Sequence, residues 1–307
     1  MKKTIILSLF FVATTWLIAE QATTSTSLNF VAATTLEAKV TLTEAVKIPL
    51  LQGSSPLTSG NNLRLSGGIE LSPVSVNGIL GATLTPIAFL QFSAGASVGS
   101  GWNIPIANGL RMNEPVLDGL GVHTGERELT GSAFDGIVWS AKAGGTFQFD
   151  FAAIYPGDWN HVVIQSYHGV KYRANTAAGA DDSWLYEADG GENRNGLAYY
   201  GNGFLGYQMP LFVSMAGILL EYDLKLYGTE GSDAWGENLG TYTVGPMVNF
   251  SITDRLSVAV LVQMQSSRKW TEETADYKFY QDRRVIKDNP LELIFYRAAL
   301  NATWQLR

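Results

Sequence analysis

Three histidines, His123, His161 and His168, are the side chains of this chain best suited to exchange protons near neutral pH. A histidine that acts as a catalytic base needs a nucleophile within hydrogen-bond reach and a third group that orients its ring. None of the three is followed two residues later by serine, and their separations do not match those of metal ligands. The sequence therefore predicts neither a histidine-based catalytic site nor a metal centre.

Acidic and basic side chains are concentrated in two polar segments. Residues 175–195 contain five of the acids, Asp181, Asp182, Glu187, Asp189 and Glu192. Carboxylate oxygens bind calcium, but the spacing is not that of an EF-hand, so we interpret the segment as an acidic surface loop. Residues 266–290 contain six basic residues, Arg268, Lys269, Lys278, Arg283, Arg284 and Lys287. We interpret these as a solvated charged loop, with binding to lipopolysaccharide or a host ligand as the alternative.

The remaining charges alternate with apolar residues. In residues 216–226 every even position is apolar, and Glu221, Asp223 and Lys225 occupy odd positions. A period of two is typical of a β-strand with two unlike faces. The charges of such a strand face water in a soluble sandwich, whereas in a membrane barrel they face a polar interior.

The same alternation predicts eleven strands, and a weaker pattern near the start of the chain indicates a twelfth. The eleven lie in residues 36–43, 63–71, 80–84, 90–98, 137–151, 161–173, 197–209, 216–226, 241–252, 256–265 and 294–306. Because bacterial single-chain barrels have an even number of strands, we expect a twelfth in residues 44–52, although Pro49 weakens it. Ten or fourteen strands are the alternatives.

The ends and the composition of the chain restrict its location. Two lysines, an apolar stretch and Ala19 predict a secretory signal peptide over residues 1–19, followed by a single barrel domain over residues 20–307. The alternative is an uncleaved anchor, but the stretch is shorter than the roughly 20 residues that span a bilayer. There is no cysteine, which excludes disulfides and N-terminal lipidation, and the net charge of −7 argues against binding nucleic acid.

The connections between predicted strands favour the membrane barrel. Short ones at residues 85–88, 209–211 and 253–255 alternate with long polar ones at 100–135, 175–195, 228–240 and 266–290. Short turns on one side and long loops on the other are typical of outer-membrane barrels. Aromatic residues near strand ends fit interfacial girdles. These are Trp102, Tyr199, Tyr207, Tyr227, Tyr242, Tyr296 and Trp304.

Over its mature length the chain resembles the outer-membrane β-barrel proteins of diderm bacteria. The resemblance implies an all-β, antiparallel up-and-down barrel in the outer membrane, with membrane lipid and the barrel-assembly machinery as partners. Members usually end in an aromatic residue that this machinery recognises, whereas this chain ends in Arg307.

Two enzyme families share this architecture, and the chain departs from both. Outer-membrane phospholipases carry the histidine–serine spacing that is missing here. Omptin-type proteases need a histidine in the loop that corresponds to residues 228–240, and that segment has none. We therefore expect no enzymatic activity, no cofactor and no metal.

The leading functional hypothesis is a pore for small solutes, and the alternative for the same charges is a closed, salt-bridged wall. The predicted lumen-lining residues are Arg64, Glu70, Lys142, Asp150, Lys171, Arg173, Glu221, Asp223, Lys225 and Arg297. A second hypothesis is a surface-binding or adhesin barrel whose long loops bind a ligand. A soluble periplasmic β-sandwich is a third.

Overall fold

In the computed structural model, which describes residues 22–187, 189–227 and 232–307, twelve antiparallel strands close into one barrel. This confirms the predicted fold class and strand number. The barrel strands are β1 (Thr23–Ala33), β2 (Ala38–Pro49), β3 (Asn62–Ser72), β4 (Ser75–Ile87), β5 (Leu90–Gly101), β10 (Val138–Asp150), β11 (Val162–Asn175), β13 (Gly196–Gln208), β14 (Val213–Lys225), β15 (Thr241–Ser251), β16 (Leu256–Arg268) and β17 (Leu291–Gln305). Because every strand of this sheet has two neighbours, the two-sheet sandwich is excluded.

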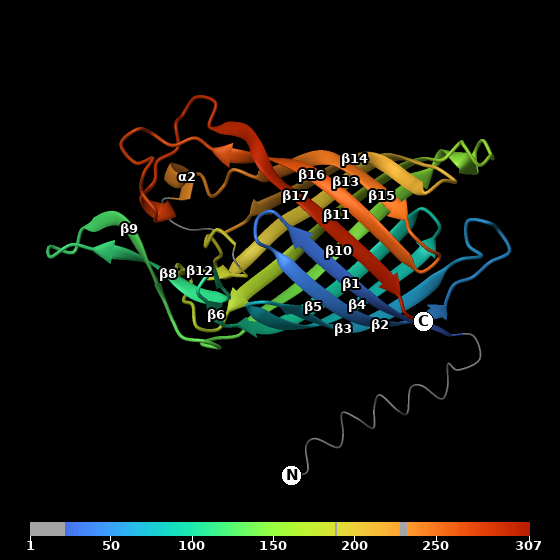
Figure 1. The fold of residues 1–307 in the computed structure, drawn as a ribbon, viewed down its shortest axis with the longest axis horizontal. Helices are drawn as coiled ribbons and strands as arrows, with labels where there is room; N and C mark the ends of the chain where they lie inside the picture. The colour runs from blue at the N-terminus through green and yellow to red at the C-terminus, as the bar shows by residue number, and fades with distance from the viewer. Residues whose placement is uncertain (1–21, 188, 228–231) are drawn as a thin grey trace, which may run out of the picture.

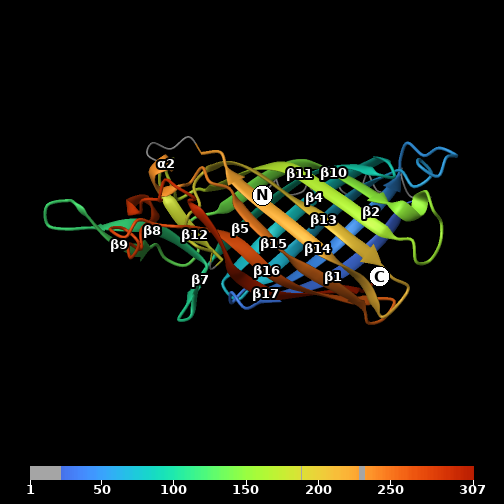
Figure 2. The same cartoon turned by 90° about the horizontal axis from the view of Figure 1, so that it is seen from above.

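The strands run obliquely around the barrel (Figures 1 and 2). They contain 11 to 15 residues each, which is enough for the roughly 9–11 residues of a tilted membrane strand and longer than most strands of soluble sheets. Each pairs with its sequence neighbour in the sheet, and β1 closes the barrel by pairing with β17. The side chains of Asn29 and Asn301 join this seam through a 2.6 Å hydrogen bond.

The twelfth strand does not lie where the sequence analysis places it. Residues 44–49 continue β2 past the predicted boundary, and the missing strand is β1, before the first predicted segment. Glu44 causes the misplaced boundary because it lies on the outer face of β2, where it accepts a 2.5 Å hydrogen bond from the Thr26 hydroxyl. An acid on the apolar face breaks the alternation without breaking the strand.

The connections differ between the two ends of the barrel. The loop end carries residues 34–37, 73–74, 102–137, 176–195, 226–240 and 269–290. The turn end carries residues 50–61, 88–89, 151–161, 209–212 and 252–255, together with the start of β1 and the C-terminus. The four longest connections share the loop end, as predicted, but that end also has two short turns. At the turn end, the connections at residues 50–61 and 151–161 are longer than the short turns that were expected there.

Two of the long connections pack together over the loop end (Figure 1). Their strands β12 (Ser183–Tyr186), β8 (Leu110–Leu117) and β9 (His123–Thr130) form a small sheet, and β6 (Asn103–Ile104) pairs with β7 (Ala107–Asn108). Residues 269–290 and the short helix α2 (Ser232–Trp235) complete this end, whereas η1 (Phe151–Ala153) lies at the turn end and η2 (Tyr280–Asp282) lies within 269–290.

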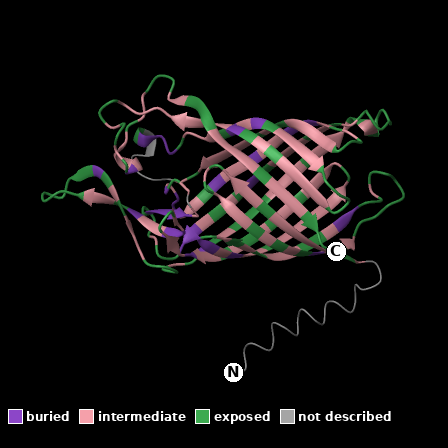
Figure 3. Cartoon of the chain, in the orientation of Figure 1, coloured by how far each residue is buried: buried purple, intermediate pink, exposed green. Residues whose placement is uncertain are grey.

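Most of the well-buried apolar side chains lie at the loop end, whereas the buried polar residues also include Gln263 on β16 and Asn61 at the turn end. In Figure 3 most of the buried segments are at the loop end, with a few along the barrel strands. Trp184 is fully buried in a cluster with Leu110, Val138 and Tyr186, which joins the loops to the start of β10. Residues 102–137 and 176–195 therefore form a packed layer with its own small core, which we call the cap.

Two further observations concern the predicted segments. The predicted signal peptide, residues 1–19, lies outside the described residues. Among the residues that the structure describes, no helix has the length and apolar character needed to cross a membrane.

Candidate functional site

The alternation along each strand separates an apolar exterior from a polar lumen. On β14, Ile218 and Leu220 lie on the outer face and are 50% and 42% exposed. Asp223 and Lys225, which have the opposite parity, line a cavity inside the barrel. The charges of this strand therefore face inward.

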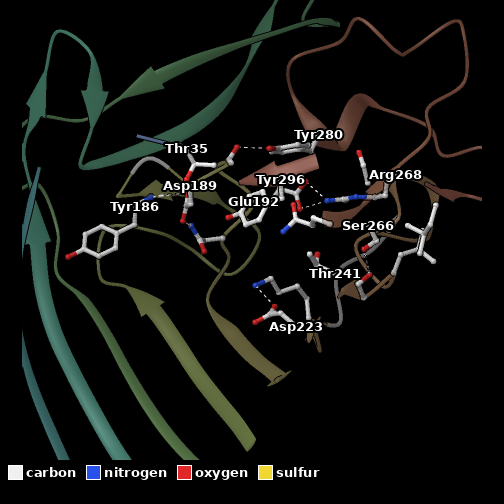
Figure 4. Close-up of a pocket in the computed structure, with 18 of the residues that line it drawn as sticks. Thr35, Tyr186, Asp189, Glu192, Asp223, Thr241, Ser266, Arg268, Tyr280 and Tyr296 are labelled. Carbon is white, nitrogen blue, oxygen red and sulfur yellow. Dashed lines mark hydrogen bonds and ion pairs between the residues drawn. The ribbon is translucent and has the colours of Figure 1, made fainter. Parts of the chain in front are cut away.

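A cavity of about 740 Å³ lies at the loop end of the lumen (Figure 4). Barrel strands, the cap and residues 269–290 all contribute to its wall. It has five cationic and five anionic side chains, Lys39, Arg173, Lys225, Arg268 and Arg283 with Glu37, Glu187, Asp189, Glu192 and Asp223. We call this space the mouth cavity.

Ion pairs on the barrel wall hold most of these charges. Asp223 accepts from Lys171 and Lys225, each at 2.7 Å, from two strands of the wall. In a second network of the wall, Arg297 lies 2.7 Å from Glu37. Its Nε also donates to Gln263, whose side-chain amide donates to Glu221 at 2.6 Å.

Glu187 joins the cap to the barrel wall. Its Oε2 lies 2.6 Å from Lys39 Nζ, and its Oε1 accepts hydrogen bonds from Ser75 at 2.7 Å and Asn77 at 2.8 Å. Burial alone raises the pKa of this carboxyl, but Lys39 and the two donors outweigh burial and hold the pKa below its ordinary value. The adjacent Tyr186 hydroxyl donates to Asn77 at 2.7 Å, which adds a second link between cap and wall.

A second cap carboxylate, Asp189, lies two residues farther along the same loop. Burial raises its pKa above the ordinary value, although Arg173, Asn193 and two backbone N–H groups oppose the shift. The Arg173 guanidinium lies 5.1 Å from the ring centre of Trp184 and 5.3 Å from that of Tyr186. Cation–π contacts of this kind fix the guanidinium where it also donates to Asn193 at 3.0 Å.

A second cavity, of about 560 Å³, lies deeper along the lumen and is called here the inner cavity. Its wall includes Glu70, Lys142, Tyr167 and Tyr200, with Ser, Thr, Gln and Asn side chains between them. Lys39 lines the mouth cavity, and its partner Glu70, 3.1 Å away, lines the inner cavity. Charged side chains thus lie where the two cavities approach each other.

The ten predicted lumen residues lie at different depths between the loop end and the turn end of the barrel. Arg173, Asp223 and Lys225 line the mouth cavity, and Lys171, Glu221 and Arg297 belong to its wall networks. Glu70 and Lys142 line the inner cavity, and Arg64 lies on the inward face of β3. Asp150 lies at the turn end, where it caps η1 and pairs with His161 at 2.6 Å.

Two of the seven predicted girdle aromatics face inward, contrary to the prediction. Tyr296 lines the mouth cavity because a β-bulge near Gln263 and Met264 shifts the register of β17. Tyr227 follows Lys225 on the inward parity and packs against Gly196.

The other five aromatics lie as follows. Tyr199, Tyr207, Tyr242 and Trp304 lie on the outward face of their strands, and Trp102 packs against Phe134 just beyond β5.

The three histidines lie in separate places. His123 of the cap strand β9 pairs with Asp282 of residues 269–290 at 2.6 Å, and His161 lies at the turn end. His168 lies on the outer face of β11, with Nδ1 2.7 Å from the Tyr199 hydroxyl and 2.6 Å from that of Tyr222. Its Nε2 lies 2.9 Å from Ser166 Oγ.

The five acids of residues 175–195 do not converge. Glu187 binds Lys39, Asp189 faces Arg173, and Glu192 pairs with Arg268. Asp181 lies 3.8 Å from Arg194, and Asp182 accepts from the backbone N–H of Gly179. Over the described ranges, no three His, Asp or Glu side chains are grouped as metal ligands.

The basic residues of the last loop divide between two surroundings. Arg268 and Arg283 line the mouth cavity and stack on Trp270 and Tyr280. Lys278 instead forms an exposed pair with Glu126 at 2.6 Å. Only part of this cluster therefore faces the lumen.

Sequence reasoning missed several lumen residues. Lys39 and Lys47 share the inward parity of β2, so the alternation of that strand is the signal that could have found both. Glu187 has no such signal, because its position depends on how the loop folds back over the barrel.

Comparison with known proteins adds little to this geometry. No model of a protein family matches the chain, and no curated protein matches it. Among solved structures it is similar to CdiB from Acinetobacter baumannii, with 8% sequence identity and a TM-score of 0.32, over 93% of this chain and 60% of CdiB. The chain thus spans about three fifths of the length of that protein. The resemblance to outer-membrane β-barrels rests on the closed twelve-stranded antiparallel sheet itself.

Proposed function

We propose that the chain is an outer-membrane barrel that lets small polar solutes pass through its lumen. The observation that carries this proposal is the succession of two polar cavities, of about 740 and 560 Å³, inside one closed barrel. The Lys39–Glu70 pair joins their walls, and such long side chains change rotamer without breaking any hydrogen bond of the sheet.

The exterior supports insertion into a bilayer. Large apolar side chains on outward positions of successive strands are exposed, among them Leu65, Leu80, Val98 and Ile218. Exposed apolar surface of this extent is costly in water but suits lipid. We place the turn end in the periplasm and the cap outside, with outer-membrane lipid and the barrel-assembly machinery as partners, and no role in binding nucleic acid. Extraction only with detergent and a heat-modifiable gel band are the expected results, and extraction in plain buffer would contradict insertion.

Planar bilayer recording tests the pore. Purified, refolded protein is expected to give single-channel steps, and the same preparation after heat denaturation is the control. Swelling of vesicles in sugars of increasing size then gives the largest solute that passes. Complete absence of steps from natively folded protein would contradict the proposal.

Binding of a ligand at the cell surface is a second candidate, because the β8–β9 hairpin projects from the loop end (Figure 1). Its tip exposes Leu117, Leu120 and Val122, and Leu120 is 90% exposed. A folded barrel that does not conduct but loses binding to host cells when residues 117–122 are replaced by a Gly-Ser turn would favour this function.

The proposal includes no hydrolytic activity. Ser166 and His168 make a hydrogen bond of the kind found in catalytic dyads, but their neighbours along β11 are engaged in the sheet ladder with β10 and β13. Backbone N–H groups held in a ladder are not available to stabilise an oxyanion. A fluorophosphonate probe is expected to leave Ser166 unmodified, and labelling that Ser166→Ala abolishes would contradict this.

A further inference from the structure

Three cationic side chains line the lumen on one side of the barrel. Lys47 on β2 and Arg64 on β3 are directly opposite each other in the strand register. Both share the inward parity with Ser66, which lines the inner cavity. Lys142, on β10, lines that cavity itself. We call these three residues the cationic arc.

The cationic arc differs from most other cations of the lumen by its lack of carboxylate partners. Among the described residues Arg283 at the mouth forms no ion pair either, but its side chain donates to the Tyr277 carbonyl oxygen and stacks on Trp270 and Tyr280. Lys39, Lys171 and Lys225 each lie within 3.1 Å of an acid, and their side chains are 28% to 30% exposed. Within the part of the chain that the structure describes, no ion pair or side-chain hydrogen bond involves Lys47, Arg64 or Lys142. All three are exposed although they face inward, so the lumen beside them is open to water.

The acids on this side of the barrel do not neutralise the arc. Glu70 is held by Lys39 and Asn77, each at 3.1 Å. Asp150 is held by His161 at the turn end. Apart from the apolar Ile79, the other inward positions that line the inner cavity between β2 and β13 carry small, hydroxyl or amide side chains, so none of them is acidic. This stretch of the lumen therefore has a surplus of positive charge.

The unpaired positive charges of the cationic arc destabilise a barrel that holds no anion. Like charges directly opposite on neighbouring strands are destabilising, and Lys47 and Arg64 are such a pair. Lys142 additionally depends on Gly95, since a Cβ there would lie 3.1 Å from Lys142 Cε and crowd its stem. A mobile anion in the lumen would relieve the repulsion.

We propose that the cationic arc makes the lumen selective for small anions, such as chloride, carboxylates and phosphate, over cations. Rings of Lys and Arg select anions in pores, and the Arg64 guanidinium can hold a carboxylate or phosphate through two hydrogen bonds. The mouth cavity has equal numbers of cationic and anionic side chains, so its charges cancel and selection occurs deeper, at the arc. This inference rests on the proposed pore function.

The test is the reversal potential across a planar bilayer with a KCl gradient, at about 0.1 M on the dilute side so that screening stays moderate. Wild type is expected to pass chloride in preference to potassium. The triple variant Lys47→Gln, Arg64→Gln, Lys142→Gln is expected to lose this preference, and Lys142→Gln alone to lose part of it. The matched control, Lys278→Gln, Arg284→Gln, Lys287→Gln, removes the same charge from the last loop and is expected to behave as wild type.

The outcomes separate the two proposals. Steps without chloride preference in wild type, or an unchanged preference in a triple variant whose heat-modifiable band shows correct folding, would overturn the anion selectivity alone. If the triple variant does not fold, the single variant Lys142→Gln is used instead, and an unchanged chloride preference in that variant would overturn the anion selectivity. No steps from any folded protein would overturn the pore and the selectivity together.

Discussion

Glu187 Oε2, in the loop between β11 and β13, lies 2.6 Å from Lys39 Nζ on the wall of β2. Because Ser75 and Asn77 donate to the other oxygen of the same carboxylate, one side chain of the cap is held by three donors of the barrel. The attachment of the cap to the wall therefore depends on the negative charge of Glu187, so removing this charge by mutation or protonation would weaken it.

Glu187→Gln is expected to loosen this attachment. A hydrogen bond to a charged group contributes about 1.5–3 kcal/mol, and the neutral amide keeps only part of it. Faster hydrogen exchange in residues 176–195 and more frequent channel opening are the expected results. Glu126→Gln breaks the exposed pair with Lys278 and serves as control, because exposed pairs contribute little. Equal exchange in both variants would contradict the attachment.

Lowering the pH is expected to protonate the Glu187 carboxylate and so to weaken the attachment of the cap. The ordinary pKa of Glu187 is 4.5 and its folded pKa is lower, so its contribution is complete above pH 4.5 and is lost as the pH falls through the folded value. Asp189, whose folded pKa is raised, acts in the opposite direction and partly offsets this loss.

Hydrogen exchange of residues 176–195 across this range measures the effect. Exchange rates are divided by the intrinsic amide rate at each pH, and on this scale wild type is expected to lose protection below pH 4.5, whereas Glu187→Gln is expected to lack that transition. A wild-type transition that the variant retains would assign the effect to another group.

The two faces of the barrel predict opposite tolerance to charge. The Leu80 side chain, on the outer face of β4, is 68% exposed, whereas its neighbour Ile79 has the inward parity of its partners Gly68 and Ser97. Leu80→Arg is expected to lower the free energy of unfolding in lipid vesicles by about 2–4 kcal/mol, and Ile79→Arg by much less. Urea titrations of both variants measure this. The reverse order would contradict insertion in this orientation.

Gly245 is predicted to be intolerant of any side chain. A Cβ there would lie 1.8 Å from the backbone carbonyl oxygen of Val262, which cannot move without disturbing the β15–β16 pairing. Gly245→Ala is expected to lower stability by about 1–3 kcal/mol, as overpacking does. Gly203→Ala is the control, because no atom lies within 4 Å of the added Cβ. Heat-modifiable mobility at rising temperature compares the two variants.

The sequence predicted most of the barrel because lipid-like and water-like surroundings impose opposite residue types on alternate positions. It missed β1 because the outward positions of that strand include Thr24 and Thr26, which weaken the contrast between the faces. The bulge that turns Tyr296 inward follows from the pairing of β16 with β17, which a single strand does not reveal.

The candidate site was less predictable than the barrel. Charges on regular strands, such as Asp223, could be assigned to one face by parity alone. The cap could not, because Glu187 reaches Lys39 only when a loop folds back over strands distant in sequence.

The seam between β1 and β17 has a consequence for how the molecule is made. Asn29 and Asn301 meet across it, although 272 positions separate them in the chain. Until β17 exists, β1 and β16 each present an unpaired row of backbone groups, which readily joins other strands. The barrel therefore closes late, and its nascent form needs protection from aggregation until the last strand has been made.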